Sequence, residues 1–526
     1  FSGDIITATA GTSNFRAGVN AGNSITSGGD KNTVVGDEAG TAITTGDFNT
    51  ALGFEAGHDI TTGSANTIIG GLAGDKLIDA SYNVAIGSGA IGADTKGSKS
   101  IAIGYNSLVT QNFTSATDTF NVAIGFEAGK AVTTGVSNTF IGGLAGDALD
   151  TGGFNVAVGR STLTTDVKGS KSTAIGFGTL RAQTFSGATD TMNTAVGFEA
   201  GNDITSGINN VIIGALTGDA LSDADNNVAI GQSALTTDTK GNKSTAVGHS
   251  ALEAQNFTSS TNTFNTAIGS DSGKAISTGT LNTIIGSSAG DGITTGTRNT
   301  ALGFNALGGA VDDGNYNTCI GSDAGLLTTG SQNCFVGGYD PSTGGSGEVM
   351  TTGSKNTILG SYNGNQSGID IRTSDNNIVL SDGDGNVKAH FKANGNMNFY
   401  NSVNNAYSLQ VLNSTTGTQP YGIRIYYTDI ARDDANGAFI ECTDSGALRF
   451  KVFNDGDVQN HDNSYAGLSD VKLKEQIADA SSQWDDIKAL TVRKYKMKTD
   501  VATGDSDAHW RLGVVAQEVE TAGMNG

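Results

Sequence analysis

The chain contains little cysteine, little positive charge and no long apolar segment. Its three cysteines, Cys319, Cys334 and Cys442, are odd in number and lack metal-site spacing, which argues against a disulfide framework or a metal centre. Lys and Arg number 30 against 52 Asp and Glu, and the formal charge of −22 disfavours nucleic acid and anionic membranes as partners. Because no transmembrane run or secretion signal is found, we expect no membrane insertion.

Helix-forming runs are also missing before about residue 470, and only 37% of the residues are hydrophobic. Disorder is nevertheless not predicted, because the apolar residues recur periodically instead of being diluted. The first residue is Phe and not Met, so we expect the natural start of the protein to lie upstream.

What the sequence does contain is a short repeat. The phrase Asn-Thr-Ala-Ile-Gly, or a close variant, recurs from Asn14 to Gly360 about every 17 residues. From Asn49 to Asn299 the spacing is 17, with every fourth interval lengthened to 21, and it loosens after Asn299. Three intervals of 17 and one of 21 make a longer period of 72, which relates Asn49 to Asn121 and Ser100 to Ser172. We call this longer period the long repeat. Fixed-period self-similarity is typical of stacked coils that bury their apolar faces only against their neighbours.

The composition of the short repeat predicts a parallel β-solenoid or β-roll. Thr, Val, Ile and Gly dominate it, and these residues favour short strands and tight turns. With the Asn as position 0, the glycine at position 4 suits positive φ or close backbone approach. Stacked Asn side chains can form a hydrogen-bonded ladder between coils. The domains expected are a shaft over residues 1–376, a β-rich neck over 377–464 and a separate C-terminal segment over 465–526.

Side chains alternate along a strand, so positions 1 and 3 share one face and position 2 occupies the other. We expect positions 1 and 3 to fill the core of the solenoid and position 2, which is Ala, Ile or Phe, to face outward. An outward apolar strip marks an interface, and a homotrimer with the three strips around a common axis is the assembly predicted. A monomer that covers the strip with its own loops is the alternative.

Two features recur once per long repeat and are candidates for binding. Each longer coil carries an enlarged loop with an aromatic residue, preceded by a pair of lysines. Aromatic and amide groups suit sugar recognition, and lysines suit anionic groups of a surface polysaccharide. In the alternative interpretation, the Phe caps the wider coil and the lysines offset Asp94, Asp166 and Asp238. The candidate residues are Phe113, Phe185, Phe257, Lys96, Lys99, Lys168, Lys171, Lys240 and Lys243.

Other candidate sites are weaker. The segment Asp382–Asn386 spaces oxygens like a calcium loop but lacks the distal Glu and is more simply a hairpin turn, so no metal and no cofactor are predicted. Polysaccharide hydrolysis would need two carboxylates about 5–10 Å apart. The candidates Glu55, Glu127 and Glu199 each lie in a repeated turn, and a single repeated carboxylate favours a turn residue over an acid/base pair.

The coils resemble the head repeats of trimeric autotransporter adhesins, and similar repeats occur in bacteriophage tail fibres. The C-terminal segments 465–477, 483–490 and 513–519 then resemble, in the same order, the intramolecular chaperone and auto-processing domain of phage tailspikes and endosialidases. The resemblance favours a phage tail fibre over the alternatives, a polysaccharide-degrading tailspike or a bacterial surface adhesin. It implies an α-rich chaperone segment that trimerises the protein.

The same resemblance implies a single self-cleavage between Ser469 and Asp470. Ser469 is then the nucleophile and Lys474 the general base, because a desolvated lysine can accept the serine proton. Lys472 stands where the family commonly has Arg, and the family's helical part extends beyond the position of Gly526. The implied partners are two further copies of the chain, other tail proteins and a host glycan or protein receptor. The implied location is the virion tail, after assembly in the host cytoplasm.

Overall fold

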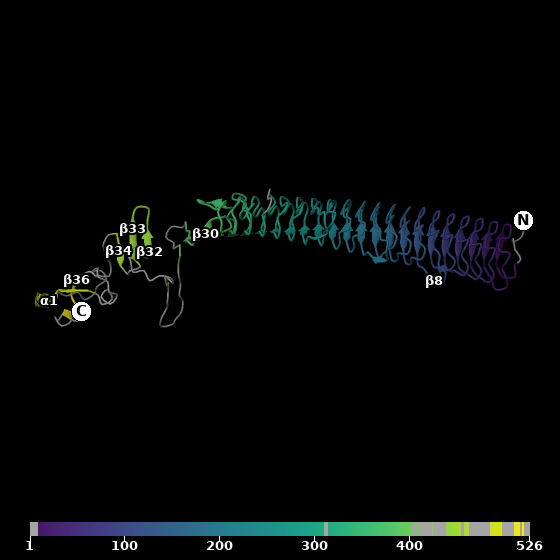
Figure 1. Ribbon diagram of the computed structural model, residues 1–526, viewed down its shortest axis with the longest axis horizontal. Helices are drawn as coiled ribbons and strands as arrows, with labels where there is room; N and C mark the ends of the chain where they lie inside the picture. Colours follow the sequence, from purple (N-terminus) through teal and green to yellow (C-terminus); the bar gives the residue numbers. More distant parts are fainter. Residues whose placement is uncertain are drawn as a thin grey trace. The chain divides into compact units, whose positions relative to one another are not determined.

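The computed structural model describes residues 9–309, 314–401, 408–409, 423, 425, 438–453, 457–461, 484–496, 510–515 and 518–519. The chain divides into two compact units, residues 1–410 and 411–526. The first unit is a stack of coils, each of which contributes one short strand to a common sheet (Figure 1).

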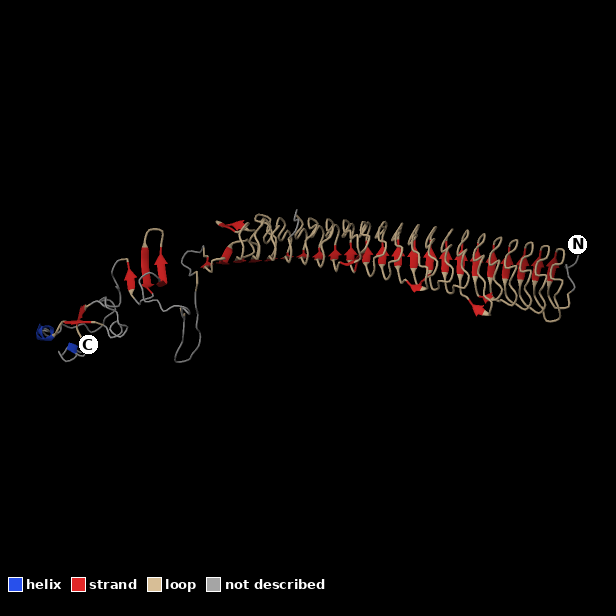
Figure 2. Ribbon diagram, viewed as in Figure 1, coloured by secondary structure: helices blue, strands red, loops and turns tan. Residues whose placement is uncertain are grey.

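Successive strands of this sheet pair in parallel, with residues one coil apart aligned: Thr50 lies beside Thr67 and Ala51 beside Ile68. Figure 2 shows these strands as one column along the first unit. The parallel β-solenoid predicted from the repeat is therefore confirmed. The strands are β1 Phe15–Ala17, β2 Thr33–Val35, β3 Thr50–Leu52, β4 Thr67–Ile69, β5 Val84–Ile86, β7 Ile101–Ile103, β9 Val122–Ile124, β10 Thr139–Ile141, β11 Val156–Val158, β13 Thr173–Ile175, β15 Thr194–Val196, β16 Val211–Ile213, β17 Val228–Ile230, β19 Thr245–Val247, β21 Thr266–Ile268, β22 Thr283–Ile285, β23 Thr300–Leu302, β24 Thr318–Ile320, β25 Cys334–Val336, β26 Thr357–Leu359 and β29 Ile378–Ser381.

The predicted orientation of the strands is wrong. Position 2 points into the coil, and its side chains are at most 1% exposed from Val34 to Val379. The reason is the thinness of the coil, whose opposite wall carries buried residues such as Ile60 and Leu77. Small side chains at position 2 leave room for that wall. Where position 2 is the large Phe140, the coil accommodates the ring with glycines at positions 129 and 146.

Positions 1 and 3 consequently form the outer face of the sheet. Their side chains are mostly Thr or Val at position 1 and Ile, Leu or Val at position 3. The leucines at position 3, such as Leu52, Leu302 and Leu359, are more than 40% exposed. An outward apolar strip therefore exists, as expected, but it is built from the opposite set of residues. We call these two positions, from β2 to β26, the outer strip.

The predicted asparagine ladder is present and fully buried. The backbone N–H of Asn49 donates to Oδ1 of Asn32 at 2.9 Å, which links one coil to the next. The Asn49 side-chain amide donates to the carbonyl of Gly63 at 2.9 Å, which closes its own coil. The same two bonds recur along the stack, for instance through Asn138 and Asn155.

Backbone strain flanks each Asn. The glycine at position 4 has φ near +135°, and a Cβ on Gly70 would lie 2.7 Å from the carbonyl oxygen of Gly87, so the expected need for glycine is confirmed. The residue before each Asn is also left-handed from Lys31 to Tyr316, although it is never glycine there. Large residues such as Phe48 and Tyr82 adopt φ near +60° at this position.

Four short strand pairs accompany the main sheet. Those at the enlarged loops are parallel: β6 Gly97–Ser98 with β8 Thr117–Asp118, β12 Gly169–Ser170 with β14 Thr189–Asp190, and β18 Gly241–Asn242 with β20 Thr261–Asn262. The fourth pair, β27 Asn365–Gln366 with β28 Ile369–Asp370, is antiparallel.

The shaft sheet continues beyond residue 376, where the shaft was expected to end. Strand β29 still pairs in parallel with β26, and the antiparallel strands β30 Val387–Phe391 and β31 Met397–Phe399 follow it. Between β29 and β30, the carboxylate of Asp382 accepts the backbone N–H of Asn386 at 2.8 Å and pairs with Lys388 at 2.9 Å. This segment is the hairpin turn that the sequence predicted.

The second unit contains two small antiparallel sheets and a short helix among its described residues. The strands are β32 Ala438–Thr443, β33 Leu448–Phe453 and β34 Val458–Asn460, then β35 Arg493–Tyr495 and β36 Arg511–Gly513, with the helix α1 Trp484–Ala489. The α-rich C-terminal segment expected from the family resemblance is therefore represented by a single short helix in the part of residues 465–526 that is described.

Two neighbouring glycines allow a matched test of the position-4 requirement. We expect Gly70→Ala to lower the stability of the shaft by about 1–3 kcal/mol, because its left-handed backbone and the nearby Gly87 carbonyl reject a Cβ. Gly71 is the control, because a Cβ there meets nothing nearer than the Phe54 carbonyl at 3.9 Å. Urea unfolding of the two variants measures the difference, and equal midpoints would contradict the explanation.

Candidate functional site

The three enlarged loops lie where the asparagine ladder is interrupted. Position 0 is Ser100, Ser172 or Ser244 in these coils, and serine cannot reach the next coil as asparagine does. The interruption is bridged by a buried glutamine. The side-chain amide of Gln111 donates to Oδ2 of Asp94 at 2.5 Å, and its carbonyl oxygen accepts the amide of Asn121 at 2.8 Å. Gln111, at position 11 of the longer coil, thus supplies hydrogen bonds that the serine cannot make.

The same network recurs in the next two long repeats. Gln183 joins Asp166 to Asn193, and Gln255 joins Asp238 to Asn265. All three glutamines and all three aspartates are fully buried. Burial raises the pKa of Asp238 above its usual range, and the bonds from Gln255 and from backbone N–H groups partly offset this effect.

The loop aromatics are largely enclosed by the shaft. Phe113 and Phe257 are 7% and 8% exposed, and Phe185 is half-buried. The backbone N–H of Phe113 also donates to Oδ1 of Asp94 at 3.1 Å, which fixes the loop against the core. These rings have a packing role in the wider coil, and little of their surface is left for a ligand. A receptor contact by Phe113, Phe185 and Phe257 stays a prediction.

The six loop lysines differ in what they contact. Lys99 and Lys171 each lie 2.6 Å from an aspartate, Asp118 and Asp190. Lys240 lies 3.4 Å from Asp223, and the Lys243 ammonium lies 5.2 Å from the centre of the Phe264 ring. None of these partners is the buried aspartate that the alternative interpretation assigned to them.

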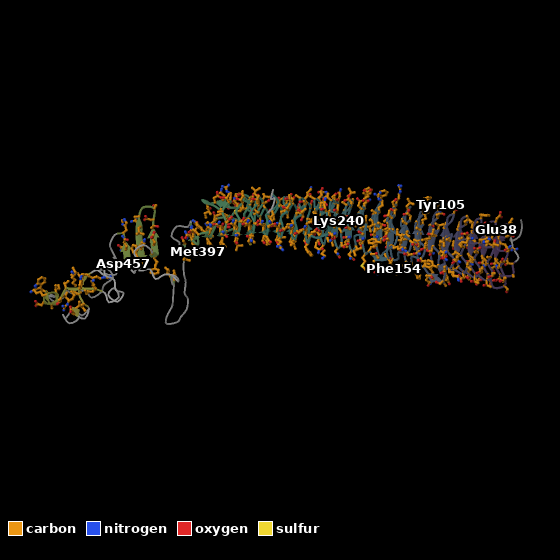
Figure 3. All side chains as sticks on the ribbon, viewed as in Figure 1. Glu38, Tyr105, Phe154, Lys240, Met397 and Asp457 are labelled. Carbon is orange, nitrogen blue, oxygen red and sulfur yellow. The ribbon has the colours of Figure 1, made fainter. Side chains whose placement is uncertain are left out.

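Lys96 and Lys168 have no acidic partner within the described ranges and are half-buried. Figure 3 labels Lys240, the third member of this row. These side chains place positive charge on the loops of a chain whose net charge is −22. Of the predicted loop residues, they are therefore the ones whose charge is most available to an anionic ligand.

The repeated turns hold acidic pairs that no sequence motif indicates. Asp147, Asp219 and Asp291 recur once per long repeat, and Oδ1 of each has no hydrogen-bond partner in the described part of the chain. Burial raises the pKa of Asp147, and the charge of the preceding coil's Glu127 raises it further. Glu127 itself pairs with Lys130 at 3.1 Å. The regular spacing of the aspartates was the available signal, but a single Asp per turn is typical of surface turns.

His390 terminates the ladder. Asn377 is the last asparagine of the ladder, so no backbone N–H of a further Asn donates to its Oδ1. Instead, Nε2 of His390 on β30 lies 3.0 Å from that oxygen. The Nδ1 atom of the buried ring has no partner among the described residues. Burial and then the charge of Lys392 lower the pKa of His390, so the neutral ring donates through Nε2.

Beside this end of the ladder lies a hollow of about 220 Å³. Lys388 and Tyr400 contribute to its lining, together with Ile369 and Val387. Its size and mixed lining fit a single sugar unit or a short side chain, which keeps the end of the shaft as a second candidate for receptor contact.

The predicted cleavage residues Ser469, Asp470 and Lys474 lie outside the described residues. No cluster of His, Cys, Asp and Glu that could hold a metal is found within the described ranges. No helix there is long and apolar enough to cross a membrane.

The His390 cap predicts a pH dependence of the shaft terminus. Because its pKa is lowered in the folded chain, unfolding takes up a proton once the pH falls below about 6.5. We therefore expect the stability of the β29–β31 region to decrease below this pH and to be constant above it. Hydrogen exchange of this region at pH 7.5 and 5.5, compared with His390→Gln, measures the effect. A pH response unchanged in the variant would contradict the assignment.

Comparison with known proteins gives one match. The model of the family described as chaperone of endosialidase matches residues 469–525, and it begins at the serine of the predicted cleavage bond. No curated protein and no solved structure matches the chain. The combination of a long parallel β-solenoid and a C-terminal segment of the endosialidase chaperone family fits a bacteriophage tail fibre or tailspike with a C-terminal chaperone domain.

Proposed function

We propose that the chain is the subunit of a homotrimeric phage tail fibre that attaches the virion to the bacterial surface. The observation that carries the proposal is the outer strip, an apolar sheet face that follows the whole shaft without a cover from its own chain in the described residues. Such a face needs a partner of equal length, and a further copy of the same shaft supplies one.

The C-terminal match supports a trimer made with the help of a chaperone. The resemblance assigns this role to residues 469–525 and implies that the segment is released by one cleavage before Asp470. Attack of the Ser469 hydroxyl on the carbonyl of the Ser469–Asp470 bond forms an ester and releases the amino group of Asp470, and water then hydrolyses the ester. Lys474 accepts the serine proton in the first step when its ammonium group is desolvated and deprotonated, and that proton passes to the departing amino group. The reaction happens once per chain, so the protein is not a turnover enzyme in this proposal.

Host attachment is assigned to the shaft loops and to the hollow at the shaft terminus. The free cations Lys96 and Lys168 recur on one side of the stack, where repeated sites on a long anionic polysaccharide can be bound together. Multivalency of this kind gives firm attachment from weak single contacts. The location that follows is the virion tail, in contact with other tail proteins.

A polysaccharide-degrading tailspike is the second candidate. The half-buried Asp147 beside Glu127 favours it, because a raised pKa on one carboxylate of a pair is what a general acid requires. The pair lies in a turn that every repeat shares, and Glu127 already forms an ion pair with Lys130. We therefore favour adhesion. Loss of depolymerase activity in Asp147→Asn would reverse the preference.

The self-cleavage is tested on the protein expressed from its complete reading frame. We expect a fragment that ends at Ser469 on a denaturing gel and a native mass three times that of the fragment. Ser469→Ala and Lys474→Ala should abolish the fragment, because one removes the nucleophile and the other the base. Ser464→Ala is the control and should cleave normally. An intact, monomeric parent protein would refute both the trimer and the chaperone assignment.

Attachment through the loops is tested by removing Lys96, Lys168 and Lys240 together, each changed to Ala. We expect binding to cells of the susceptible bacterium to fall about tenfold or more and its salt dependence to weaken. The control removes Lys76, Lys130 and Lys274, which changes the net charge equally but lies in the repeated turns. Equal losses in both variants would show a general charge effect and would contradict a loop site.

A further inference from the structure

The outer strip is bordered by two rows of exposed side chains. The leading row consists of the residue before each repeat Asn or Ser, from Lys31 to Tyr316, and the trailing row of the residue after each position-4 glycine, from Asp37 to Ser322. Many members are large and exposed, such as Phe120 at 55% and Phe126 at 56%. Figure 3 labels one member of each row, Phe154 and Tyr105, at opposite margins of the shaft.

The two rows match coil by coil. Every basic residue of the leading row shares its coil with an acid or an aromatic ring in the trailing row, and the one arginine of the trailing row, Arg160, shares its coil with Phe154. No coil from Asn32 to Asn317 carries like formal charges in both rows. The matched basic pairs are Lys31 with Asp37, Lys99 with Tyr105, Lys171 with Phe177, Lys243 with His249 and Arg298 with Phe304.

Contact within one chain does not explain this match. Positions −1 and 5 of a coil lie beyond opposite ends of the same three-residue strand, as Lys99 and Tyr105 do on either side of β7, at most about 20 Å apart at 3.3 Å per residue. The contacts that the rows do make within the chain run along the stack: Lys99 lies over Phe120 at 5.2 Å, and Tyr105 stacks on Phe126 at 5.5 Å. A match across the strand therefore points to a second molecule.

Cyclic symmetry provides the required contact. The strands run across the stack, so when parallel shafts turn their outer strips toward a common axis, all strands circulate in the same sense around it. The end of each strand then meets the start of the neighbour's strand. We infer that the leading row of each copy packs against the trailing row of the next copy, coil against the same coil, and closes a ring of three.

This inference rests on the proposed trimer and specifies its contacts and register. In the ring, a leading-row lysine such as Lys99 lies between the ring of Phe120 in its own chain and the aromatic residue of its neighbour's matched coil. Cation–π and aromatic contacts along both margins then hold the register, while the outer strip excludes water. A shift by one coil is about 4.8 Å. In one direction it places Lys171 against Arg160, and in the other it places Lys243 and Arg298 against Ser270 and Ser322. Only the in-register arrangement gives every basic residue an acidic or aromatic partner.

Disulfide trapping tests the register in a background where the native Cys334 and Cys442 are replaced by Thr and Ser. The test pair is Ser137→Cys with Gly143→Cys, which belong to the two rows of one coil. Serine to cysteine is nearly isosteric, and a Cβ on Gly143 meets nothing nearer than 3.9 Å. We expect oxidation to produce a covalent trimer, because each copy offers one cysteine to each neighbour.

The controls separate the register from the trimer itself. Each single variant should give no cross-link, and the pair Lys171→Cys with Gly143→Cys, two coils or about 10 Å out of register, should not link either. Asn209→Cys with Ala215→Cys repeats the test in another coil and should again give a covalent trimer.

Three results would overturn the inference. A trimeric native mass with no in-register cross-link in either coil, or with equal linking of the shifted pair, would refute the register and leave the proposed trimer standing. Cross-linked dimers from a single variant would indicate a face-to-face contact between copies instead of a ring. A monomeric native mass would refute the proposed trimer and the register with it.

Discussion

The buried asparagine ladder is the interaction on which the shaft depends. Each Asn closes its own coil with its amide and receives the next coil with its oxygen, as Asn49 does through Gly63 and Asn66. A buried polar group left without its partner costs about 1–3 kcal/mol, so the position cannot change without a replacement for both bonds. Gln111 and Asp94 are such a replacement where serine stands in the ladder, and His390 is another where the ladder ends. The features that looked most like binding motifs are thus partly consequences of maintaining the ladder.

The sequence was sufficient for the period, the parallel sheet, the ladder and the glycines, because each follows from a spacing and a residue type. It was not sufficient to decide which face of each strand points into the coil. Alternation defines two faces, and both faces are apolar here, so only the volume inside the coil decides which one is buried. The small Ala51 side chain fits inside the coil with Ile60, whereas the larger Leu52 side chain points outward and is exposed. The left-handed backbone at Phe48 and Tyr82 was also unpredictable, because large residues rarely adopt it without the bonds of a repeated turn around them.

The candidate site was predictable in position and less so in role. The long repeat located the loops, but the burial of Gln111 and Phe113 depends on where the chain returns to the core, which no motif records. A signal did exist: serine replaces asparagine only in coils that carry Gln at position 11 and follow a coil with Asp at that position. The cleavage residues were predicted from their sequence motif alone, and the family match at residues 469–525 depends on the same stretch of sequence.

The arrangement of the insertions bears on how assembly and recognition coexist. The enlarged loops add residues between position 11 and the next Asn, so every coil still contributes one aligned strand to the sheet, as β7 and β9 show on either side of such a loop. The outer strip and its two bordering rows therefore keep a constant rise per coil, which a long in-register interface requires. The loops, by contrast, can gain or lose residues without shifting that register. The variation in coil length from Asn32 to Asn299 is accordingly confined to one side of the repeat, where it leaves the aligned strands unchanged.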